Sequence, residues 1–258
     1  MQSPAERAWF LLCSGLGQLL RAGRYSRVRI ISRGGQLEVR KYRVFYAPLL
    51  VWMSRPLLEV LDAGVRVLPR REWVERERRL YRDLYSASIR VDADRTLVLP
   101  CLAGKTLASL LEDPELEESV RKRAVALAVA ALAELHARGL THADAMAENV
   151  MVDLEAGVAR WFDFETVHDS RRPMAWRRAD DVRALLATCL LRTAPEEAPG
   201  TLRVVLDVYA DEEVARLLTR SFTLVLRRGL AFQLGQAGLS FRRFREITRL
   251  LRRGQQTR

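Results

Sequence analysis

Cysteine and long apolar runs are both scarce in this sequence, and each shortage excludes a class of protein. Only three cysteines occur among 258 residues, at Cys13, Cys101 and Cys189. A sparse, odd and widely spaced set argues against a disulfide scaffold or a cysteine-rich zinc site, and it favours a reducing compartment. No run of about 18 apolar residues is present, so no transmembrane helix is predicted. The N-terminus also lacks the pattern of a secretory signal.

Lysine is almost missing, although the chain is strongly basic. The formal net charge is +11, but only Lys41, Lys105 and Lys122 are lysines, and the other 40 of the 43 basic residues are arginine. Such a ratio often follows genomic base composition, so it is weak evidence for an anionic partner. No nucleic-acid-binding motif accompanies the charge, and no nucleic-acid partner is expected. Because lysine is a compact point charge, each of the three invites a functional explanation.

The spacing of apolar residues divides the chain into a strand-rich first part and a helix-rich second part. Hairpins are predicted over 27–43 and 89–99, and the chain after 178 is expected to be mostly helical. Further helices are predicted over 5–20, 44–61, 71–85, 106–111 and 118–137. This order is typical of an α+β protein with two lobes, residues 1–100 and residues 101–258.

Three polar residues follow the helix predicted over 118–137. Asp144 and Asn149 precede a predicted strand at 150–152, and Asp163 follows its hairpin partner at 158–162. Because antiparallel pairing brings the start of one strand beside the end of the next, Asn149 and Asp163 should be neighbours. Turn or cap roles would explain any one of the three. Together they favour a magnesium site, since this ion prefers oxygen ligands that it shares with substrate phosphates.

These residues carry a resemblance to a known family. His142, Asp144 and Asn149 in HADAMAEN resemble the protein-kinase catalytic loop H-R-D-x-x-x-x-N, and Asp163-Phe164-Glu165 resembles D-F-G. The combination looks closest to bacterial kinase-like proteins of the lipopolysaccharide-kinase group, including the Kdo-kinase type, with RIO-type kinases as relatives. The resemblance is tight over 118–185, looser over 28–117 and weak elsewhere. It implies a two-lobed protein-kinase-like fold that uses ATP and Mg²⁺, with Asp144 as the catalytic base and Asn149 and Asp163 as metal ligands.

The same resemblance implies roles in the first lobe, which would bind the nucleotide. Lys41, the only lysine in the first 100 residues, would hold the α/β-phosphates and pair with a helix glutamate. Glu72, Glu75 and Glu77 compete for that place. Only Glu77 is followed by apolar residues three, four and seven positions later, so Glu77 is predicted to face the core.

The adenine site is expected at the end of the first lobe. Residues 96–102 resemble the last strand and the hinge of the family, where adenine would bind backbone groups near Pro100, Cys101 and Leu102. Other family signals are missing. No clear G-x-G-x-x-G precedes Lys41, so a degenerate phosphate-covering loop is expected around 23–26, and Glu165 stands where the family has glycine.

The segment after Asp163 is short. Only 17 positions separate Asp163 from Asp180, which leaves little room for docking a peptide and favours a small or lipid-linked acceptor, bound by the second lobe. Residues 178–181 are expected to open a helix. The family resemblance implies that an aspartate at this helix start, either Asp180 or Asp181, braces the catalytic loop, although an N-cap role explains each nearly as well. His142 is expected to be a structural brace, whereas His136 and His168 receive no role.

The sequence thus predicts an ATP-dependent phosphotransferase acting on a sugar hydroxyl of a lipopolysaccharide-type or other small or lipid-linked acceptor. Two alternatives stay open: an aminoglycoside-phosphotransferase-like small-molecule kinase, and a pseudokinase that serves as a regulatory binding module. The termini combine apolar and basic residues, which suits either core-packed helices with an arginine-rich solvated face or helices on an anionic membrane surface. The apolar stretch 44–61 is a further candidate for a membrane or partner contact. The expected location is the cytoplasm, with peripheral attachment to the inner membrane as a hypothesis. The acceptor and the oligomeric state cannot be read from the sequence.

Overall fold

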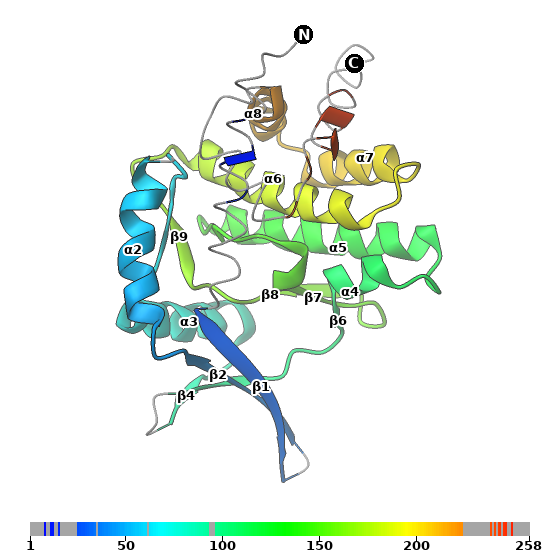
Figure 1. The fold of residues 1–258 in the computed structure, drawn as a ribbon. Helices are drawn as coiled ribbons and strands as arrows, with labels where there is room; N and C mark the ends of the chain where they lie inside the picture. Colours follow the sequence, from blue (N-terminus) through cyan, green and yellow to red (C-terminus); the bar gives the residue numbers. More distant parts are fainter. Residues whose placement is uncertain are drawn as a thin grey trace.

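The computed structural model describes residues 25–34, 36–60, 62–92 and 96–223, with a few single residues near both ends (Figure 1). Three expectations fall largely outside these ranges. They are the helix predicted over 5–20, the first half of the loop expected at 23–26, and the apolar and basic segments near the C-terminus. None of the helices that the model describes is both long and apolar enough to cross a membrane.

A four-stranded antiparallel sheet forms the first part of the chain, with the strand order β1-β2-β5-β4. Its strands are β1 (Ser26–Arg33), β2 (Gln36–Arg43), β4 (Arg90–Val91) and β5 (Leu97–Pro100). Both predicted hairpins are therefore confirmed. Gly34 has a φ of +59° in the turn between β1 and β2, a conformation that glycine adopts without steric strain. The register places Leu97 opposite Lys41 and Pro100 opposite Glu38.

Helix α3 (Arg70–Tyr85) confirms the amphipathic helix predicted over 71–85. It buries Trp73, Glu77, Leu80 and Tyr81, which recur at spacings of one, three or four and so share one face. A glutamate on this apolar face is unusual, because buried carboxylates are rare without a partner. The burial of Glu77 therefore calls for an explanation in terms of the residues opposite the helix.

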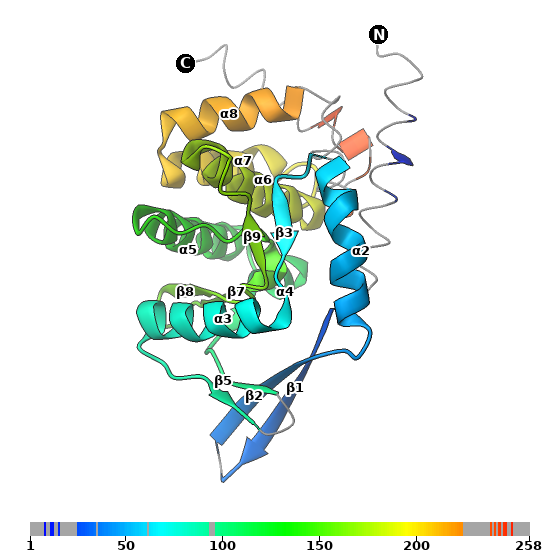
Figure 2. The ribbon, with the colours of Figure 1, turned by 90° about the vertical axis from the view of Figure 1, so that its left-hand side faces the viewer.

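A helix and a strand lie between β2 and α3. Helix α2 (Ala47–Val60) corresponds to the helix predicted over 44–61, and β3 (Val65–Val67) follows it. Strand β3 pairs antiparallel with β9 (Thr166–His168), which lies a hundred residues later in the chain. Figure 2 shows α2 standing beside this two-stranded sheet. The sheet is absent from the sequence-based prediction because each strand has only three residues, too few for a pattern of alternation.

The second part of the chain is mainly helical. Its elements are β6 (Lys105–Thr106), α4 (Leu107–Glu112), α5 (Glu118–Ala137), a 3-10 helix (Ala147–Asn149), β7 (Val150–Asp153), β8 (Val158–Trp161), α6 (Met174–Arg192), α7 (Ala198–Tyr209) and α8 (Glu212–Thr223). Helix α5 lies next to the hairpin β7–β8, and α8 lies farthest from it (Figure 1). The helices predicted over 106–111 and 118–137 and the hairpin after Asn149 are confirmed.

One expectation about helix α6 is wrong. The helix was expected to open at residues 178–181, but it begins at Met174. Asp180 and Asp181 therefore lie inside the helix, where both are buried, and neither is its N-cap. Pro173 immediately precedes the first helical residue, consistent with the preference of proline for helix starts.

One hydrophobic cluster joins the two parts of the chain. It contains Leu97 and Leu80 from the first part and Leu132, Leu185 and Phe164 from the second, all almost completely buried. The protein is therefore α+β, with a strand-rich N-terminal region and a helical C-terminal part, as the sequence predicted. The chain segments that carry the predicted site residues meet around this shared core.

Candidate active site

Lys41 lies at the centre of a group of carboxylates from distant parts of the chain. Its ammonium forms an ion pair with Asp163, and it lies 3.5 Å from Glu77 Oε1 and 3.7 Å from Glu165 Oε2. The lysine side chain is only 4% exposed. Burial alone would lower the pKa of Lys41, but the charges of Asp163, Glu165 and Glu77 outweigh it and hold the pKa above its usual value. The ammonium is therefore fully charged at neutral pH.

Glu77 is held in place by two hydrogen bonds to the same oxygen. The indole Nε1 of Trp73 and the backbone N–H of Phe164 each donate to Oε1 at 3.1 Å. Burial raises the pKa of this carboxyl, and the ammonium of Lys41 opposes that effect. The two competing residues lie on the surface, where Glu72 pairs with Arg66 and Glu75 with Arg71. Of the three glutamates considered from the sequence, the structure brings only Glu77 to Lys41.

The backbone at Asp163 directs its carboxylate toward Lys41. Asp163 has a φ of +68°, in the left-handed region that only a few residue types tolerate. The next residue, Phe164, is completely buried and bonds through its N–H to Glu77, so the unusual conformation is fixed from the C-terminal side. Non-glycine residues in this region cluster at functional sites, where surrounding contacts hold them.

Asp144 and Asn149 form a second group beside the first. The amide Nδ2 of Asn149 donates to Oδ2 of Asp144 at 2.9 Å and to its backbone carbonyl at 2.8 Å. The N–H of Phe162 donates to the carbonyl of Asn149 at 3.0 Å, which places Asn149 beside the residue that precedes Asp163. This arrangement follows the hairpin register expected from the sequence. Burial, with the charges of Asp163 and Glu165, raises the pKa of Asp144 to about 7.

Asp181 is the residue that braces the loop containing Asp144. Its carboxylate accepts hydrogen bonds from the N–H groups of His142 at 2.8 Å and Ala143 at 2.7 Å. Asp180 instead contacts Nε2 of His168 at 3.0 Å, so the choice left open by the sequence falls on Asp181. Burial acts to raise the pKa of Asp181, but nearby histidines outweigh it and hold the pKa at about 2. The carboxylate is therefore ionised and accepts both backbone donors.

Three buried histidines support these aspartates and the loop. His136 Nε2 lies 3.0 Å from Asp181, and His142 Nε2 lies 2.9 Å from the carbonyl of Phe162. His142 thus joins the loop to the end of β8, in agreement with the structural role expected for it. His136 and His168 received no role from the sequence, because nothing in their spacing indicated that each would face a buried carboxylate of α6.

Glu165 is a site residue that the sequence did not identify. The hydroxyl of Ser26 donates to Glu165 Oε2 at 2.6 Å, and Arg43 lies 3.7 Å from the same oxygen. Glu165 therefore connects β1 and β2 with the segment before β9. The sequence marked it only as a replacement for the glycine of D-F-G, since no local pattern shows which basic residues a loop glutamate will meet.

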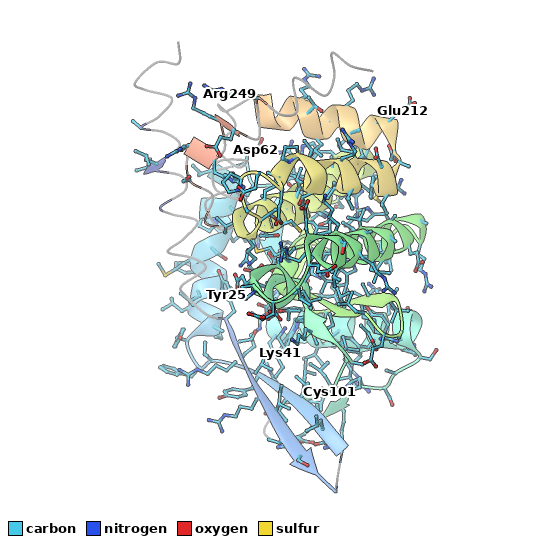
Figure 3. The ribbon with its side chains drawn as sticks, turned by 90° about the vertical axis from the view of Figure 1, so that its right-hand side faces the viewer. Tyr25, Lys41, Asp62, Cys101, Glu212 and Arg249 are labelled. Atoms are coloured by element: carbon cyan, nitrogen blue, oxygen red, sulfur yellow. The ribbon has the colours of Figure 1, made fainter. Side chains whose placement is uncertain are left out.

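The residues expected to bind adenine lie farther along the sheet. Pro100, Cys101 and Leu102 line an open groove of about 1140 Å³ together with residues of β2, β4 and α3. Figure 3 shows Lys41 where the sheet meets the helical part, with Cys101 farther out. Neither Lys41 nor the carboxylates around it line this groove. The structure thus brings together Lys41, Glu77, Asp144, Asn149 and Asp163, but it does not join the predicted hinge to them in one pocket.

The oxygen donors around Asp163 fit a magnesium ion. Among the described residues, no group of three or more His, Cys, Asp or Glu is arranged to hold a metal ion. Magnesium does not need such a group, because it is usually held by one or two carboxylates with substrate phosphates. Asn149 uses its Nδ2 for Asp144, which leaves Oδ1 as an oxygen donor on a residue that pairs with Phe162, the residue before Asp163. The charges that raise the pKa of Asp144 also favour a cation here.

Comparisons with known proteins add no family to this geometry. The chain matches no protein-family model, and it has no match among curated proteins. The arrangement of Lys41, Glu77, Asp144, Asn149 and Asp163 is therefore the basis for a functional proposal.

Proposed function

We propose that this protein is an ATP-dependent phosphotransferase with a protein-kinase-like fold, which transfers the γ-phosphoryl group of ATP to an alcohol hydroxyl. The observation that carries the proposal is the position of Lys41. This buried lysine lies on a strand, faces Glu77 of a helix and pairs with Asp163 at the end of a hairpin that also presents Asn149 and Asp144. In phosphoryl transfer, positioning and charge stabilisation supply most of the catalysis.

In this mechanism Lys41 binds the α/β-phosphate oxygens. The raised pKa of Lys41 keeps the ammonium charged over the physiological pH range. Glu77 restrains it from one side, and Glu77 itself is restrained by Trp73 and by the N–H of Phe164. A preorganised charge of this kind stabilises the negative charge that develops on the departing ADP without reorganisation during the reaction.

Asp144 orients the acceptor hydroxyl and takes its proton. A base works best when its pKa lies near the working pH, and the pKa of Asp144 is raised to about 7. Asn149 fixes the carboxylate through its Nδ2, and Asp181 fixes the backbone of the same loop. Asn149 and Asp163 would hold Mg²⁺, whose contribution when bound is to neutralise charge on the phosphate oxygens.

The acceptor is proposed to be small or lipid-linked, such as a sugar hydroxyl of a lipopolysaccharide-type molecule. Between Asp163 and the start of α6 at Met174 the chain forms only the three-residue strand β9, which is paired with β3. This short segment supports the proposal because it provides no extended platform for a peptide. We propose the cytoplasm as the location of the enzyme, because ATP is available there.

A thermal-shift experiment tests the nucleotide site before any acceptor is known. ATP at about 100 times its Kd should stabilise the protein by roughly 2.7 kcal/mol. We expect stabilisation that requires Mg²⁺ and is lost in Asp163→Asn. The matched control is Asp83→Asn, an exposed aspartate of α3, which should behave as wild type. Magnesium-dependent stabilisation would justify a screen for ADP release, starting with Kdo-containing acceptors. Absence of stabilisation in wild type would contradict the proposal and favour a pseudokinase.

A further inference from the structure

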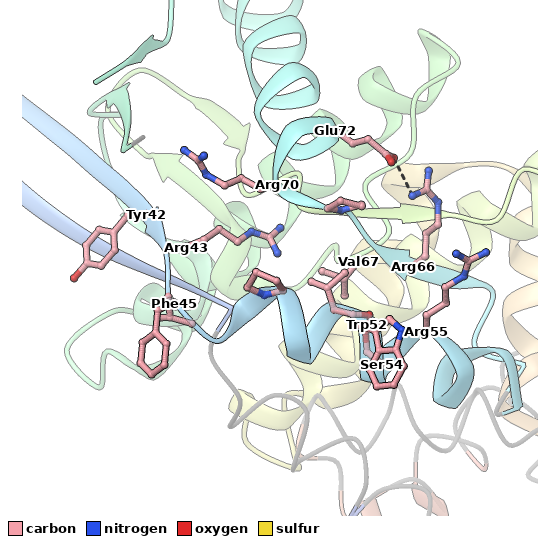
Figure 4. A pocket seen from close by; sticks show the side chains of 14 residues that line it. Tyr42, Arg43, Phe45, Trp52, Ser54, Arg55, Arg66, Val67, Arg70 and Glu72 are labelled. Atoms are coloured by element: carbon pink, nitrogen blue, oxygen red, sulfur yellow. Dashed lines mark hydrogen bonds and ion pairs between the residues drawn. The ribbon is translucent and has the colours of Figure 1, made fainter. Parts of the chain in front are cut away.

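A second pocket lies outside the group around Lys41. It has a volume of about 650 Å³, within the range typical of ligand sites, and it is formed by the end of β2, α2, β3 and the start of α3 (Figure 4). Lys41, Glu77, Asp144, Asn149 and Asp163 do not line it. This cavity, called here the α2 pocket, therefore needs an explanation of its own.

The lining of the α2 pocket is strongly basic. It contains four arginines and a single carboxylate, Glu72, which pairs with Arg66 at 2.9 Å. Arginines therefore outnumber carboxylates within the lining, although Arg55 also lies 3.5 Å from Glu59 and Arg43 lies 3.7 Å from Glu165, both outside it. The four arginines are Arg43, Arg55, Arg66 and Arg70. Because the planar guanidinium matches phosphate and carboxylate oxygens, such a lining suits an anionic group.

Arg43 distinguishes the pocket from an ordinary basic surface. Its side chain is only 6% exposed, yet its Nε and Nη1 atoms are buried without a hydrogen-bond partner. Nη2 donates to the carbonyl of Leu68 at 3.0 Å and lies 3.7 Å from Glu165, and the guanidinium lies over the ring of Trp73, 4.9 Å from its centre. Buried donors without acceptors are rare and unfavourable. Figure 4 shows this guanidinium among the other lining residues, between α2 and the start of α3.

Aromatic side chains border the same pocket. Phe45 is 94% exposed and Trp52 is 74% exposed, although large aromatic residues normally bury most of their surface. Leu49 and Met53 of α2 are exposed beside them. Exposed apolar groups next to arginines are typical of surfaces that contact lipid, where the rings lie at head-group level and the cations meet phosphates.

We propose that the α2 pocket binds the phosphate-bearing head group of an anionic lipid. Binding exposes the unpartnered Nε and Nη1 donors of Arg43, which the phosphate then contacts, and the half-exposed guanidinium of Arg66 supplies further donors beside its pair with Glu72. The apolar part of the lipid lies along Phe45 and Trp52. A soluble phosphate ester would satisfy the arginines but would leave the two rings exposed, so the rings favour a lipid. This inference does not depend on the proposed phosphotransfer activity.

Flotation with vesicles tests the proposal on the full chain. Wild type should float with vesicles of phosphatidylcholine and phosphatidic acid, and should not float with phosphatidylcholine alone. Arg43→Gln and Trp52→Ser should each weaken binding about tenfold or more, as expected for a lost charge-assisted hydrogen bond or a lost apolar anchor. Because Arg43 is buried and its variant could fail to fold, Arg66→Gln at a half-exposed position serves as a second charge variant.

The control variant is Arg71→Gln, which removes the same charge from an exposed site outside the pocket. Equal weakening by Arg71→Gln and Arg66→Gln would overturn the proposal in favour of general electrostatic attraction. A second experiment measures thermal stabilisation by glycerol 3-phosphate, a soluble phosphate ester. If this ester stabilises wild type and Trp52→Ser equally while no vesicle binds, the pocket takes a soluble phosphate ester and the lipid proposal is wrong. Stabilisation by Mg-ATP should be unchanged in Trp52→Ser.

Discussion

The ammonium of Lys41 pairs with the carboxylate of Asp163, 122 residues later in the chain, and no other lysine occurs in the first hundred residues. Glu77 and Glu165 lie within 4 Å of the same ammonium. The ammonium of Lys41 therefore lies among three carboxylates from a helix and a loop, and Arg43 also lies near one of them, Glu165. The mutual repulsion of these carboxylates would oppose folding without the ammonium, so Lys41 has a structural task in addition to the proposed binding of phosphate.

Replacing Lys41 tests both its structural role and its proposed role in binding phosphate. Lys41→Met should abolish nucleotide-dependent stabilisation and should lower the free energy of unfolding at pH 7 by about 3–5 kcal/mol, because it removes the ammonium that pairs with Asp163 and lies beside Glu77. The loss should shrink as the pH falls, since protonation neutralises those carboxylates. Urea unfolding between pH 4 and pH 8 measures it. Lys105→Met, at an exposed lysine paired with Asp113, is the control and should unfold like wild type at every pH.

The raised pKa of Asp144 predicts that this residue lowers the free energy of unfolding as the pH rises. Its pKa is about 7 in the folded protein and about 3.9 in an unfolded chain, so the folded state binds the proton more tightly. The stabilising contribution of this group is therefore complete below pH 4 and is lost as the pH rises through 7. Asp144→Asn should be more stable than wild type at pH 8 by about 1–4 kcal/mol, and equally stable near pH 4.

Only the difference between the two proteins isolates this effect. Burial lowers the pKa values of His142 and His168 to about 4, so these two groups destabilise the fold as the pH falls from about 6.5 toward 4. The histidines and Asp144 thus act in opposite directions over the same pH range. Urea titrations of wild type and Asp144→Asn in parallel cancel the histidine contribution. A constant difference between pH 4 and pH 8 would show that folding does not change the pKa of Asp144, which contradicts the prediction.

The sequence predicted most of this site because its signals are local. Asp144, Asn149 and Asp163 flank a hairpin whose pairing follows from alternation and turn residues, and Glu77 lies on a helix whose apolar spacing shows its inner face. Each of these positions depends on neighbours within about 20 residues. Element type and side-chain direction were sufficient to place them.

The residues that the sequence missed depend on long-range contacts. Glu165 meets Ser26 across 139 positions, and His136 meets Asp181 across 45. Strand β3 has three residues and becomes a strand only because β9 pairs with it. The start of α6 was misplaced because two aspartates resemble an N-cap, whereas here they face buried histidines. Propensity cannot distinguish these cases, since the deciding partner is remote in sequence.

Glu165 is predicted to affect the pKa of the proposed base Asp144 more than the stability of the fold. Its charge contributes to the raised pKa of Asp144, after burial and the charge of Asp163. Glu165→Gln removes that charge and retains an oxygen that can accept from Ser26. The acidic limb of the pH–rate profile for phosphotransfer should therefore move to lower pH by about 0.5–1 unit. Glu155→Gln, at an exposed turn, is the control. If the profile moves equally in both variants, the charge of Glu165 has no specific effect on the pKa of Asp144, and the prediction is wrong.

Asp181 should hold the catalytic loop through both of its oxygens. Oδ1 accepts from the N–H of Ala143, and Oδ2 accepts from the N–H of His142. In Asp181→Asn one oxygen becomes an amide donor that faces a backbone donor, so the free energy of unfolding should fall by about 2–4 kcal/mol at pH 7. Because the pKa of Asp181 is about 2 when folded, the wild-type contribution is present above pH 4 and is lost toward pH 2.

The Asp181→Asn variant also tests whether the loop is held as a unit. Ala143 has a φ of +68°, a strained conformation that the hydrogen bond to Asp181 maintains. Its release should increase amide hydrogen exchange at residues 142–144 by at least tenfold, while exchange in α3 stays unchanged. Asp83→Asn provides the matched control for a lost aspartate charge. If exchange rises uniformly over the whole chain instead, Asp181 stabilises the fold in general, and its contacts with the loop carry no special role.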